Sequence, residues 1–195
     1  MARPAVKRSP IEQAAISLFA RKGLTSTTIK DIAASAGVTE GALYRHYSGK
    51  IQMAWELYRR EVEVFLAGLS PILDQTGPTT QEKLLAAVRF IYRYYKDAPE
   101  TLVFVLLARR SFPQEDTSFE PVDNDPDDVI QRFIEREMPS GRSSKSNAAL
   151  LTAMLRGVVL EPILMHRDGR IKAHPTALAE KVAVACVAIL KGQGA

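Results

Sequence analysis

The chain has 195 residues, of which 46% are hydrophobic and 25% charged, and its formal net charge is +4. This composition is typical of a globular protein and excludes a largely disordered chain. Cys186 is the single cysteine, which excludes an intrachain disulfide, and no apolar run reaches the roughly 18–20 residues that a membrane span needs. We therefore expect a cytoplasmic protein without a membrane partner.

The positive charge is concentrated near the start of the chain. Residues 1–50 carry eight Lys or Arg against three Asp or Glu, whereas the other 145 residues carry 18 against 19. Such an asymmetry indicates an anionic polymer as the partner of the first quarter alone. Three of these cations, Arg3, Lys7 and Arg8, form a basic N-terminal arm whose role the sequence leaves open between contact with the polymer and solvation.

A first helix is expected to begin at Ser9-Pro10-Ile11-Glu12, which matches a capping box with proline at the first helical position. Ile11, Ala14, Ala15, Leu18 and Phe19 follow the spacing of one buried helical face. Gly23 comes after two basic residues and has the place of a helix stop.

Two more helices follow closely. The second is expected from Thr27 or Thr28, with Asp31 in capping reach, to Gly37. The third is expected to be short, beginning at Thr39 and ending near Tyr47. Two helices joined by a tight glycine turn, the second of them short, form a helix-turn-helix.

The third helix has an inward and an outward side. Leu43 and Tyr47 share the buried side, with Glu40 nearer its edge, and Arg45 lies opposite between the small residues Gly41 and Ala42. Small residues permit close approach to a DNA major groove, where an arginine pairs with guanine O6 and N7. Tyr44 and His46, on the two flanks, would reach phosphates on the groove walls, and Lys50 would meet a phosphate from the start of a fourth helix. The alternative is a three-helix bundle with a merely solvated polar face.

The segment "TTIKDIAASAGVTEGALYRHYSGK", Thr27–Lys50, resembles the DNA-binding segment of the tetracycline-repressor (TetR) family of bacterial regulators, and the likeness extends over about Ser9–Leu57. It implies an operator in double-stranded DNA. The implied phosphate contacts come from Thr27 or Thr28, Thr39, Tyr44, His46 and Lys50. The implied base contacts come from Glu40, Gly41, Ala42 and Arg45.

The rest of the chain is expected to be helical. A long amphipathic helix should follow Ser48 and end at the proline- and glycine-containing stretch 70–80. Further helices are expected at 81–96, 99–112 and 126–138, with an acidic loop over 112–128 whose order the sequence does not decide.

The last two helices are expected at 148–166 and 175–192. The first of these is apolar nearly all round, and Pro162 should kink or end it. The second carries a stripe of Ala179, Ala183, Val187 and Leu190. We expect the pair to form a homodimer interface across a two-fold axis, with burial inside one subunit as the alternative. A dimer presents two reading helices to a palindromic operator.

Aromatic residues between these regions are candidates for a small-molecule pocket, although each also suits an ordinary core. They are Trp55, Tyr58, Phe65, Phe90, Tyr94, Phe104 and Phe133. The family resemblance implies that an effector bound here moves the helix after Ser48 and releases the DNA. The apolar content favours a hydrophobic effector.

Other functions fit the sequence less well. It has no nucleophile elbow, no Gly-rich phosphate loop and no metal-spaced cluster, so we expect no enzyme, no metal and no cofactor. A His166, His174 and Cys186 metal site or a redox role for Cys186 would be the exceptions. An architectural DNA-binding protein without effector is the main alternative, and a small helical enzyme the lesser one.

The overall prediction is an all-α protein. Residues 1–52 would form a three-helix DNA-binding domain and residues 53–195 a larger helical effector-binding and dimerisation domain. Together they would make a repressor released by its ligand. The effector, the operator sequence, the target genes and the sign of regulation are not given by the sequence.

Overall fold

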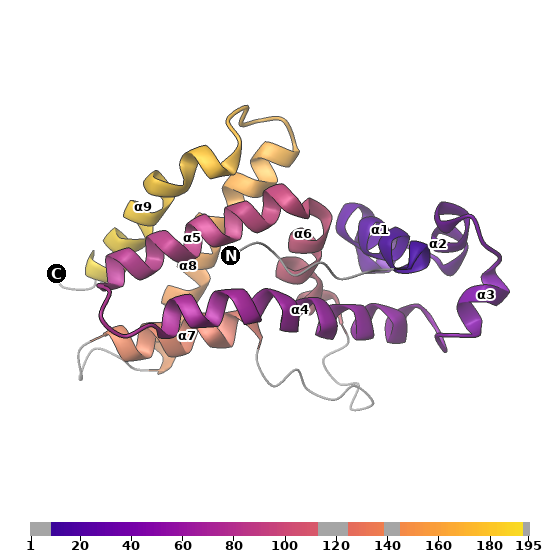
Figure 1. Ribbon diagram of the computed structural model, residues 1–195, viewed down its shortest axis with the longest axis horizontal. Helices are drawn as coiled ribbons and strands as arrows, with labels where there is room; N and C mark the ends of the chain where they lie inside the picture. The colour runs from indigo at the N-terminus through magenta and orange to yellow at the C-terminus, as the bar shows by residue number, and fades with distance from the viewer. Residues whose placement is uncertain (1–8, 113–124, 139–144, 193–195) are drawn as a thin grey trace. The chain divides into compact units, whose positions relative to one another are not determined.

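The computed structural model describes residues 9–112, 125–138 and 145–192, and within these ranges helices joined by short turns and loops form the fold, without a β-strand (Figure 1). The predicted all-α fold is therefore confirmed. The α-helices are α1 (Pro10–Ser26), α2 (Ile29–Ala36), α3 (Glu40–Tyr44), α4 (Lys50–Asp74), α5 (Thr80–Asp97), α6 (Pro99–Leu107), α7 (Pro126–Glu137), α8 (Lys145–Arg167) and α9 (Ala179–Lys191). Two short 3-10 helices, η1 (Ala108–Ser111) and η2 (Pro175–Leu178), follow α6 and precede α9.

The chain divides into two compact units. Unit 1 consists of Met1–Phe65 and Asp97–Asp123, and unit 2 of Leu66–Lys96 and Asn124–Ala195. Helix α4 contributes residues to both, so it is a continuous covalent link between them. The predicted domain boundary after residue 52 falls inside α4 and stays a prediction.

The first two helices begin where their capping residues place them. Ser9 accepts from the N–H of Glu12 while the Glu12 side chain accepts from the N–H of Ser9, and Thr28 and Asp31 make the same reciprocal pair at α2. Gly23 has a φ of 80°, which interrupts the helical backbone of α1 near its predicted end.

The turn between α2 and α3 depends on one left-handed glycine. Gly37 has a φ of 68°, a conformation that costs other residues roughly 1–2 kcal/mol, and its N–H closes onto the last carbonyls of α2. Helix α3 then ends at Tyr44 and not near Tyr47 as expected. The N–H groups of His46 and Tyr47 still bond to the Leu43 carbonyl, so the chain continues as a turn.

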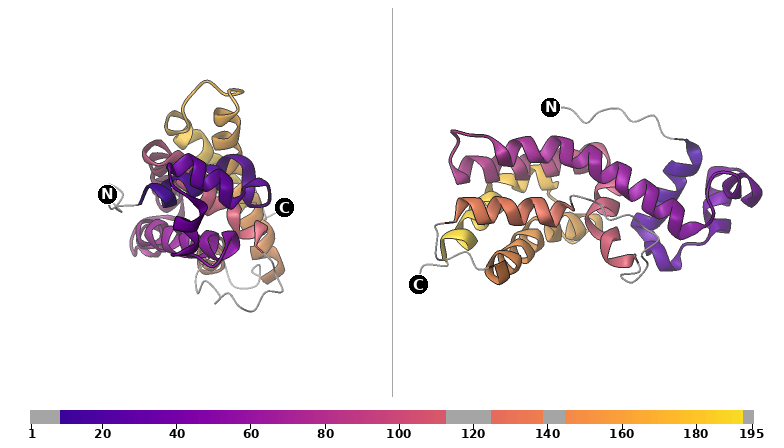
Figure 2. Two further views of the ribbon diagram at one scale, coloured as in Figure 1. Left: turned by 90° about the vertical axis from the view of Figure 1, so that its right-hand side faces the viewer. Right: turned by 90° about the horizontal axis from the view of Figure 1, so that it is seen from below.

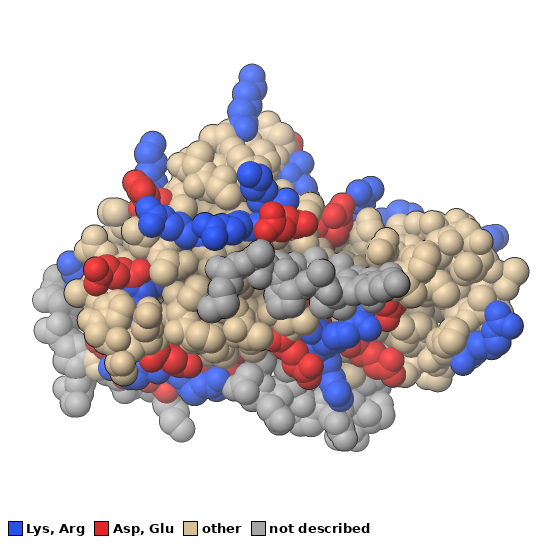
Figure 3. All heavy atoms as spheres, viewed as in Figure 1, with Lys and Arg blue, Asp and Glu red and all other residues tan. Residues whose placement is uncertain are grey.

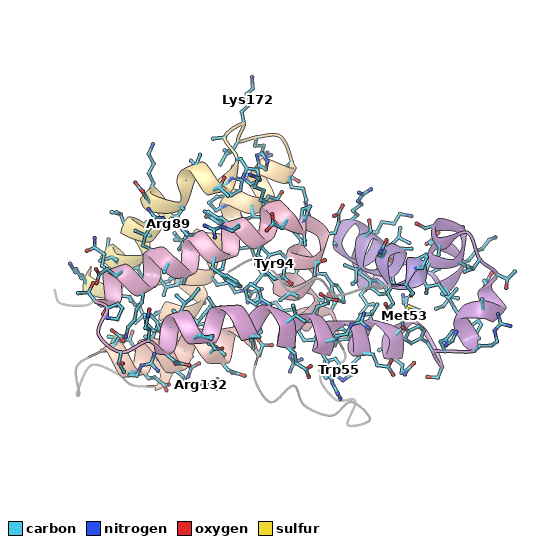
Figure 4. All side chains as sticks on the ribbon, viewed as in Figure 1. Met53, Trp55, Arg89, Tyr94, Arg132 and Lys172 are labelled. Carbon is cyan, nitrogen blue, oxygen red and sulfur yellow. The ribbon has the colours of Figure 1, made fainter. Side chains whose placement is uncertain are left out.

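The core of unit 1 is formed by α1 against α2 and α6. Phe19 of α1 stacks on Phe104 of α6 with ring centroids 5.8 Å apart. Met53, fully buried on α4, points toward α1 (Figure 4). The hydrophobic core beneath α1 and α2 is therefore made by residues far apart in the sequence.

Unit 2 is built from the C-terminal part of α4 together with α5, α7, α8 and α9. Helix α8 packs against both α7 and α9 (Figure 2). The hydroxyl of Tyr92 on α5 donates to the Val159 carbonyl of α8 at 3.1 Å, and Arg89 on α5 pairs with Glu180 on α9 at 2.8 Å (Figure 4). These contacts hold the last two helices beside α5.

Two prolines lie inside helices, although α4 ends within the predicted stretch 70–80. Pro71 lies inside α4, which continues to Asp74, and Pro162 lies inside α8, which continues to Arg167. A proline in a helix interior costs about 3 kcal/mol, whereas burying one large aliphatic side chain contributes about 1.5–3 kcal/mol. Burial of Leu69 and Leu73 around Pro71, and of Ile163 beside Pro162, offsets that cost.

Candidate nucleic-acid interface

Two side chains hold α3 onto the rest of unit 1, on the side that the sequence predicts. Leu43 is fully buried. Tyr47, just after the helix, is half-buried, and its hydroxyl donates to the Glu12 carboxylate of α1 at 3.5 Å. The inward face of the third helix is therefore confirmed for both residues.

The outward side of α3 exposes the residues predicted to read DNA. Tyr44 is 56% exposed, Arg45 and His46 are exposed, and Gly41 is exposed with no atom closer than 3.9 Å to the place of a Cβ. Ala42 is half-exposed. The side chains around Arg45 are therefore accessible to a large partner.

Glu40 is placed differently from the expectation. It is exposed at the start of α3, not near the buried edge. The projection treats the helix as ideal from its first residue, whereas Glu40 directly follows the extended Thr39 and projects away from the core. Its proximity to a base would therefore depend on the N-terminal end of α3 approaching the groove.

The three threonines have three different surroundings. Thr27 is fully buried, and its hydroxyl donates to the Gly23 carbonyl at 2.8 Å, so it offers no side-chain surface to a partner. Thr28 is exposed and caps α2. Thr39 is exposed and makes no side-chain capping bond to α3. Of the alternative phosphate contacts Thr27 and Thr28, only Thr28 is compatible with the structure.

Lys50 has a protein partner that the sequence did not reveal. Its ammonium donates to the Thr25 carbonyl at 3.2 Å, from the first turn of α4. The helix dipole disfavours a cation at that position, and this carbonyl provides compensation besides the predicted phosphate. An ammonium has three donors, so both partners are compatible.

On the face that Figure 3 shows, Lys and Arg side chains project from the end of unit 1 that carries α2 and α3, and no Asp or Glu is visible there. Cations gathered on one surface attract a polyanion. The three basic residues of the N-terminal arm lie outside the described residues.

The aromatic residues predicted to line a pocket fall into both units. Trp55, Tyr58, Phe65 and Phe104 belong to unit 1, and Phe90, Tyr94 and Phe133 belong to unit 2. In unit 1, Tyr58 lies near Trp55 and Phe104, with ring centroids 5.9 and 6.2 Å away. Phe90 and Tyr94, on α5, lie 6.0 Å apart. Their role in effector binding stays a prediction.

Sequence reasoning missed two members of the unit 1 cluster. Phe112 contacts Trp55 at 4.9 Å edge-to-face, and Phe19 stacks on Phe104. The sequence pattern predicts Phe19 on the core face of the first helix, and Phe112 follows η1 at the edge of the acidic loop. No local pattern connects positions so far apart with Trp55.

The residues considered for a metal site lie in unit 2. The rings of His166 and His174 are 5.1 Å apart, with Tyr95 of α5 beside both. Across the described ranges, no group of three or more His, Cys, Asp or Glu is arranged to hold a metal. Cys186 is buried, and burial raises the pKa of its thiol to about 11, which disfavours the reactive thiolate.

Residues 11–57 match the family model "Bacterial regulatory proteins, tetR family". The matched region spans α1, α2, α3 and the first turns of α4, including the exposed face described above. Over this segment the chain belongs to the TetR family. The expected resemblance to that family is thereby confirmed.

A curated relative is the transcriptional repressor KstR2 of Mycolicibacterium smegmatis, 40% identical over 82 residues, which cover 42% of this chain. The match spans 40% of the length of that repressor. Among solved structures, the TetR-family regulator of Bordetella parapertussis is similar with a TM-score of 0.72 at 18% identity, covering 91% of this chain and 92% of that one.

The regulator FadR of Bacillus subtilis, solved with stearoyl-CoA, has a TM-score of 0.70 at 18% identity, covering 95% of this chain and 99% of that one. These structures share the TetR fold over nearly the full chain. At this identity they carry the fold only, whereas sequence likeness is concentrated in the N-terminal part.

Proposed function

We propose that this TetR-family protein is a DNA-binding transcriptional regulator. The observation that carries the proposal is the outward side of the α3 segment, where Gly41, Tyr44 and Arg45 are exposed while Leu43 is buried behind them. Arg45 would pair with guanine in the major groove, and Tyr44 and His46 would contact the flanking phosphates. Thr28, Thr39 and Lys50 would add phosphate contacts, and Glu40, Gly41 and Ala42 would lie near the bases.

The protein would act as a homodimer through α8 and α9. Among the described residues, the exposed large hydrophobic side chains are Val38, Tyr44, Leu150, Met154 and Val184. The first two lie around α3, and the other three on α8 and α9. Monomeric proteins rarely leave such apolar stripes in water, so a second copy would cover them.

Spacing along α8 supports this face. Leu150, Met154, Gly157 and Glu161 recur at helical intervals and are all exposed in one chain, and no atom lies within 4 Å of a Cβ placed on Gly157. A residue without a side chain at the centre of a helical face permits close approach of another helix. Two copies of α8 and α9 would then form a four-helix interface.

Helix α8 is also long and apolar enough to cross a membrane by length and composition alone, over Asn147–Arg167, and 28% of its most apolar stretch is buried within one chain. Two charged residues lie inside that stretch, Arg156, which approaches Asp127 at 3.6 Å, and Glu161. Charges are costly at the centre of a bilayer. We therefore assign the exposed face to a partner helix, and the protein to the cytoplasm, where its DNA would lie.

A dimer of this kind would bind a palindromic operator, because its two α3 helices would enter half-sites about 34–36 Å apart. The relatives named above include a repressor, which favours repression. The operator DNA would be released when a small hydrophobic effector binds and shifts α4. The candidate pocket residues named above, which range from Trp55 to Phe133, would contact that effector. Stearoyl-CoA occupies the Bacillus subtilis FadR structure, so a long-chain acyl-CoA is the first effector to test.

The test is an in vitro selection from a random pool of DNA duplexes with the purified full-length chain. We expect enrichment of one palindromic sequence, bound by a dimer, with affinity that falls steeply as salt increases. Recovery of no preferred sequence would contradict the proposal and favour an architectural DNA-binding protein. Addition of an acyl-CoA to the complex then tests whether this class of effector releases the duplex.

A further inference from the structure

One carboxylate in unit 1 connects three segments of the chain. Glu12 Oε1 accepts from Arg60 Nη1 of α4 at 2.8 Å and from the Tyr47 hydroxyl at 3.5 Å, while Glu12 Oε2 accepts from the Ser9 N–H at 2.9 Å. Glu12 therefore joins the start of α1, the turn that follows α3, and the middle of α4. The residues it joins lie 35 and 48 positions away along the chain.

The contact between Glu12 and Arg60 is an ion pair that is partly shielded from solvent. The Glu12 side chain is 14% exposed and that of Arg60 39%. Burial, the largest influence, works to raise the pKa of Glu12, but donation from Arg60 and from the Ser9 N–H outweighs it and holds the pKa below its ordinary value. Burial, together with Glu12 and Glu56, raises the pKa of Tyr47, so its hydroxyl keeps the proton that it donates.

Arg60 has N–H donors that do not bond to Glu12. Among the described residues, its buried Nε and Nη2 have no hydrogen-bond partner. The Nε lies 3.8 Å from the carboxylate of Glu61, its neighbour on α4, which is fully buried. Glu12 belongs to α1, whereas Glu61 moves with Arg60. A shift of α4 along α1 would thus exchange an ion pair between two helices for one within α4.

We propose that Tyr47, Glu12 and Arg60 form a positioning relay. In it the Arg60–Glu12 pair fixes the recognition segment, α3 with the turn that follows it to Tyr47, relative to α4. Exchange of Glu12 for Glu61 as the partner of Arg60 would loosen that segment. The relay rests on the proposed function, because it gives α4 a means to control how α3 meets the operator. Its members touch no DNA base; they act through the orientation of the segment that does.

The variant that tests the relay most cleanly is Glu12→Gln. A glutamine at this position still completes the capping box with Ser9, so α1 keeps its start, but the charge that holds Arg60 is lost. Tyr47→Phe removes the hydroxyl that donates to Glu12 Oε1. It is the second variant to test if Glu12→Gln does not fold. Arg60→Lys keeps the charge but removes the planar fork.

The matched control is Glu100→Gln. Glu100 also pairs with an arginine at 2.8 Å, Arg21 of α1, and the change removes the same charge from unit 1. The pair lies on the surface of α6 and α1, away from Tyr47 in the sequence, and has no connection to the recognition segment among the hydrogen bonds of the described residues. Affinity should stay within about twofold of the unmodified protein.

The experiment measures binding to the duplex selected by the unmodified full-length protein, and to duplexes with one base pair added or removed between the half-sites. For Glu12→Gln and Arg60→Lys we expect affinity to fall by roughly tenfold and discrimination among spacings to weaken. The double variant should be no weaker than the worse single one, since both break one unit. Circular dichroism confirms that each protein is folded at the temperature used.

A purely structural role predicts lower melting temperatures with affinity and spacing preference unchanged in the folded protein, and that result would overturn the relay. Additive losses in the double variant would overturn it as well. If the unmodified protein selects no duplex, the proposed function fails and the relay fails with it. If it selects one and Glu12→Gln binds that duplex as well as Glu100→Gln does, the relay alone is wrong.

Discussion

Gly68 on α4 packs directly against Phe90 on α5, so closely that a Cβ on Gly68 would lie 2.5 Å from two ring carbons of Phe90. Both residues belong to unit 2, where Phe90 is half-buried and also meets Tyr94. Absence of a side chain at Gly68 is thus a condition for the α4–α5 packing.

Gly68→Ala should therefore destabilise the protein. Alanine is favoured in a helix by about 0.5–1 kcal/mol, but overpacking costs about 1–3 kcal/mol, so the free energy of unfolding in urea should fall by roughly 1 kcal/mol. In a Phe90→Leu background the same change should become neutral or stabilising. An equal loss in both backgrounds would show that Phe90 is not the cause.

Introducing a charge on the exposed face of α8 or α9 should separate the proposed dimer. Met154 and Val184 are 42% and 62% exposed in one chain, so Met154→Glu and Val184→Glu should change the stability of a monomer by less than about 0.5 kcal/mol. At an interface each would bury an unpaired charge, which costs several kcal/mol.

Sedimentation velocity at micromolar concentration should thus show a dimer for the unmodified protein and monomers for both variants. Gln81→Glu, which adds the same charge to an exposed position on α5, is the control and should stay dimeric. A monomeric unmodified protein would refute the interface, and so would dimeric variants.

His174 should make stability fall at mildly acidic pH. Burial, followed by the charges of His166 and Lys96, lowers the pKa of this ring below 6.5, and Tyr95 stacks on it. Nδ1 of the neutral ring accepts a hydrogen bond from the Thr176 N–H at the start of η2. A protonated ring has no free acceptor and would lose this bond.

The folded chain thus binds the proton less readily than the unfolded chain. The stabilisation is fully present above the ordinary value of 6.5 and is lost as pH falls through the lower folded value. Urea unfolding between about pH 7.5 and about pH 5.5 should show a smaller decline for His174→Gln than for the unmodified protein or for His46→Gln. Equal declines in all three proteins would contradict this account.

Lys50→Ala distinguishes two partners of the same ammonium. If Lys50 contacts a phosphate, binding should weaken for every duplex, and the slope of log affinity against log salt should decrease by about 1. If it only caps the Thr25 carbonyl, the melting temperature should fall while the salt slope is unchanged. Titrations at several salt concentrations, with thermal unfolding of the same samples, give both quantities.

What the sequence could predict depends on how local its cause is. Ser9 with Glu12 and Thr28 with Asp31 place two helix starts correctly, because each capping pair spans three residues. Leu43 and Tyr47 point inward as their spacing predicts. These interactions follow from helical geometry alone.

Thr27 and Arg60 show where local reasoning fails. Thr27 is buried because its hydroxyl meets the backbone at Gly23, and Arg60 meets a carboxylate 48 residues earlier. Such outcomes depend on tertiary contacts that no periodicity in the sequence encodes.

The most direct test of the proposed function is the specificity that Arg45 provides. We would measure the affinity of the unmodified protein and of Arg45→Ala, at one salt concentration, for the selected duplex and for a duplex of scrambled sequence. A bidentate arginine–guanine contact is worth roughly 1–3 kcal/mol, so Arg45→Ala should reduce the ratio of the two affinities by about fivefold to more than a hundredfold. An unchanged ratio would contradict the assignment of α3 as the helix that reads DNA.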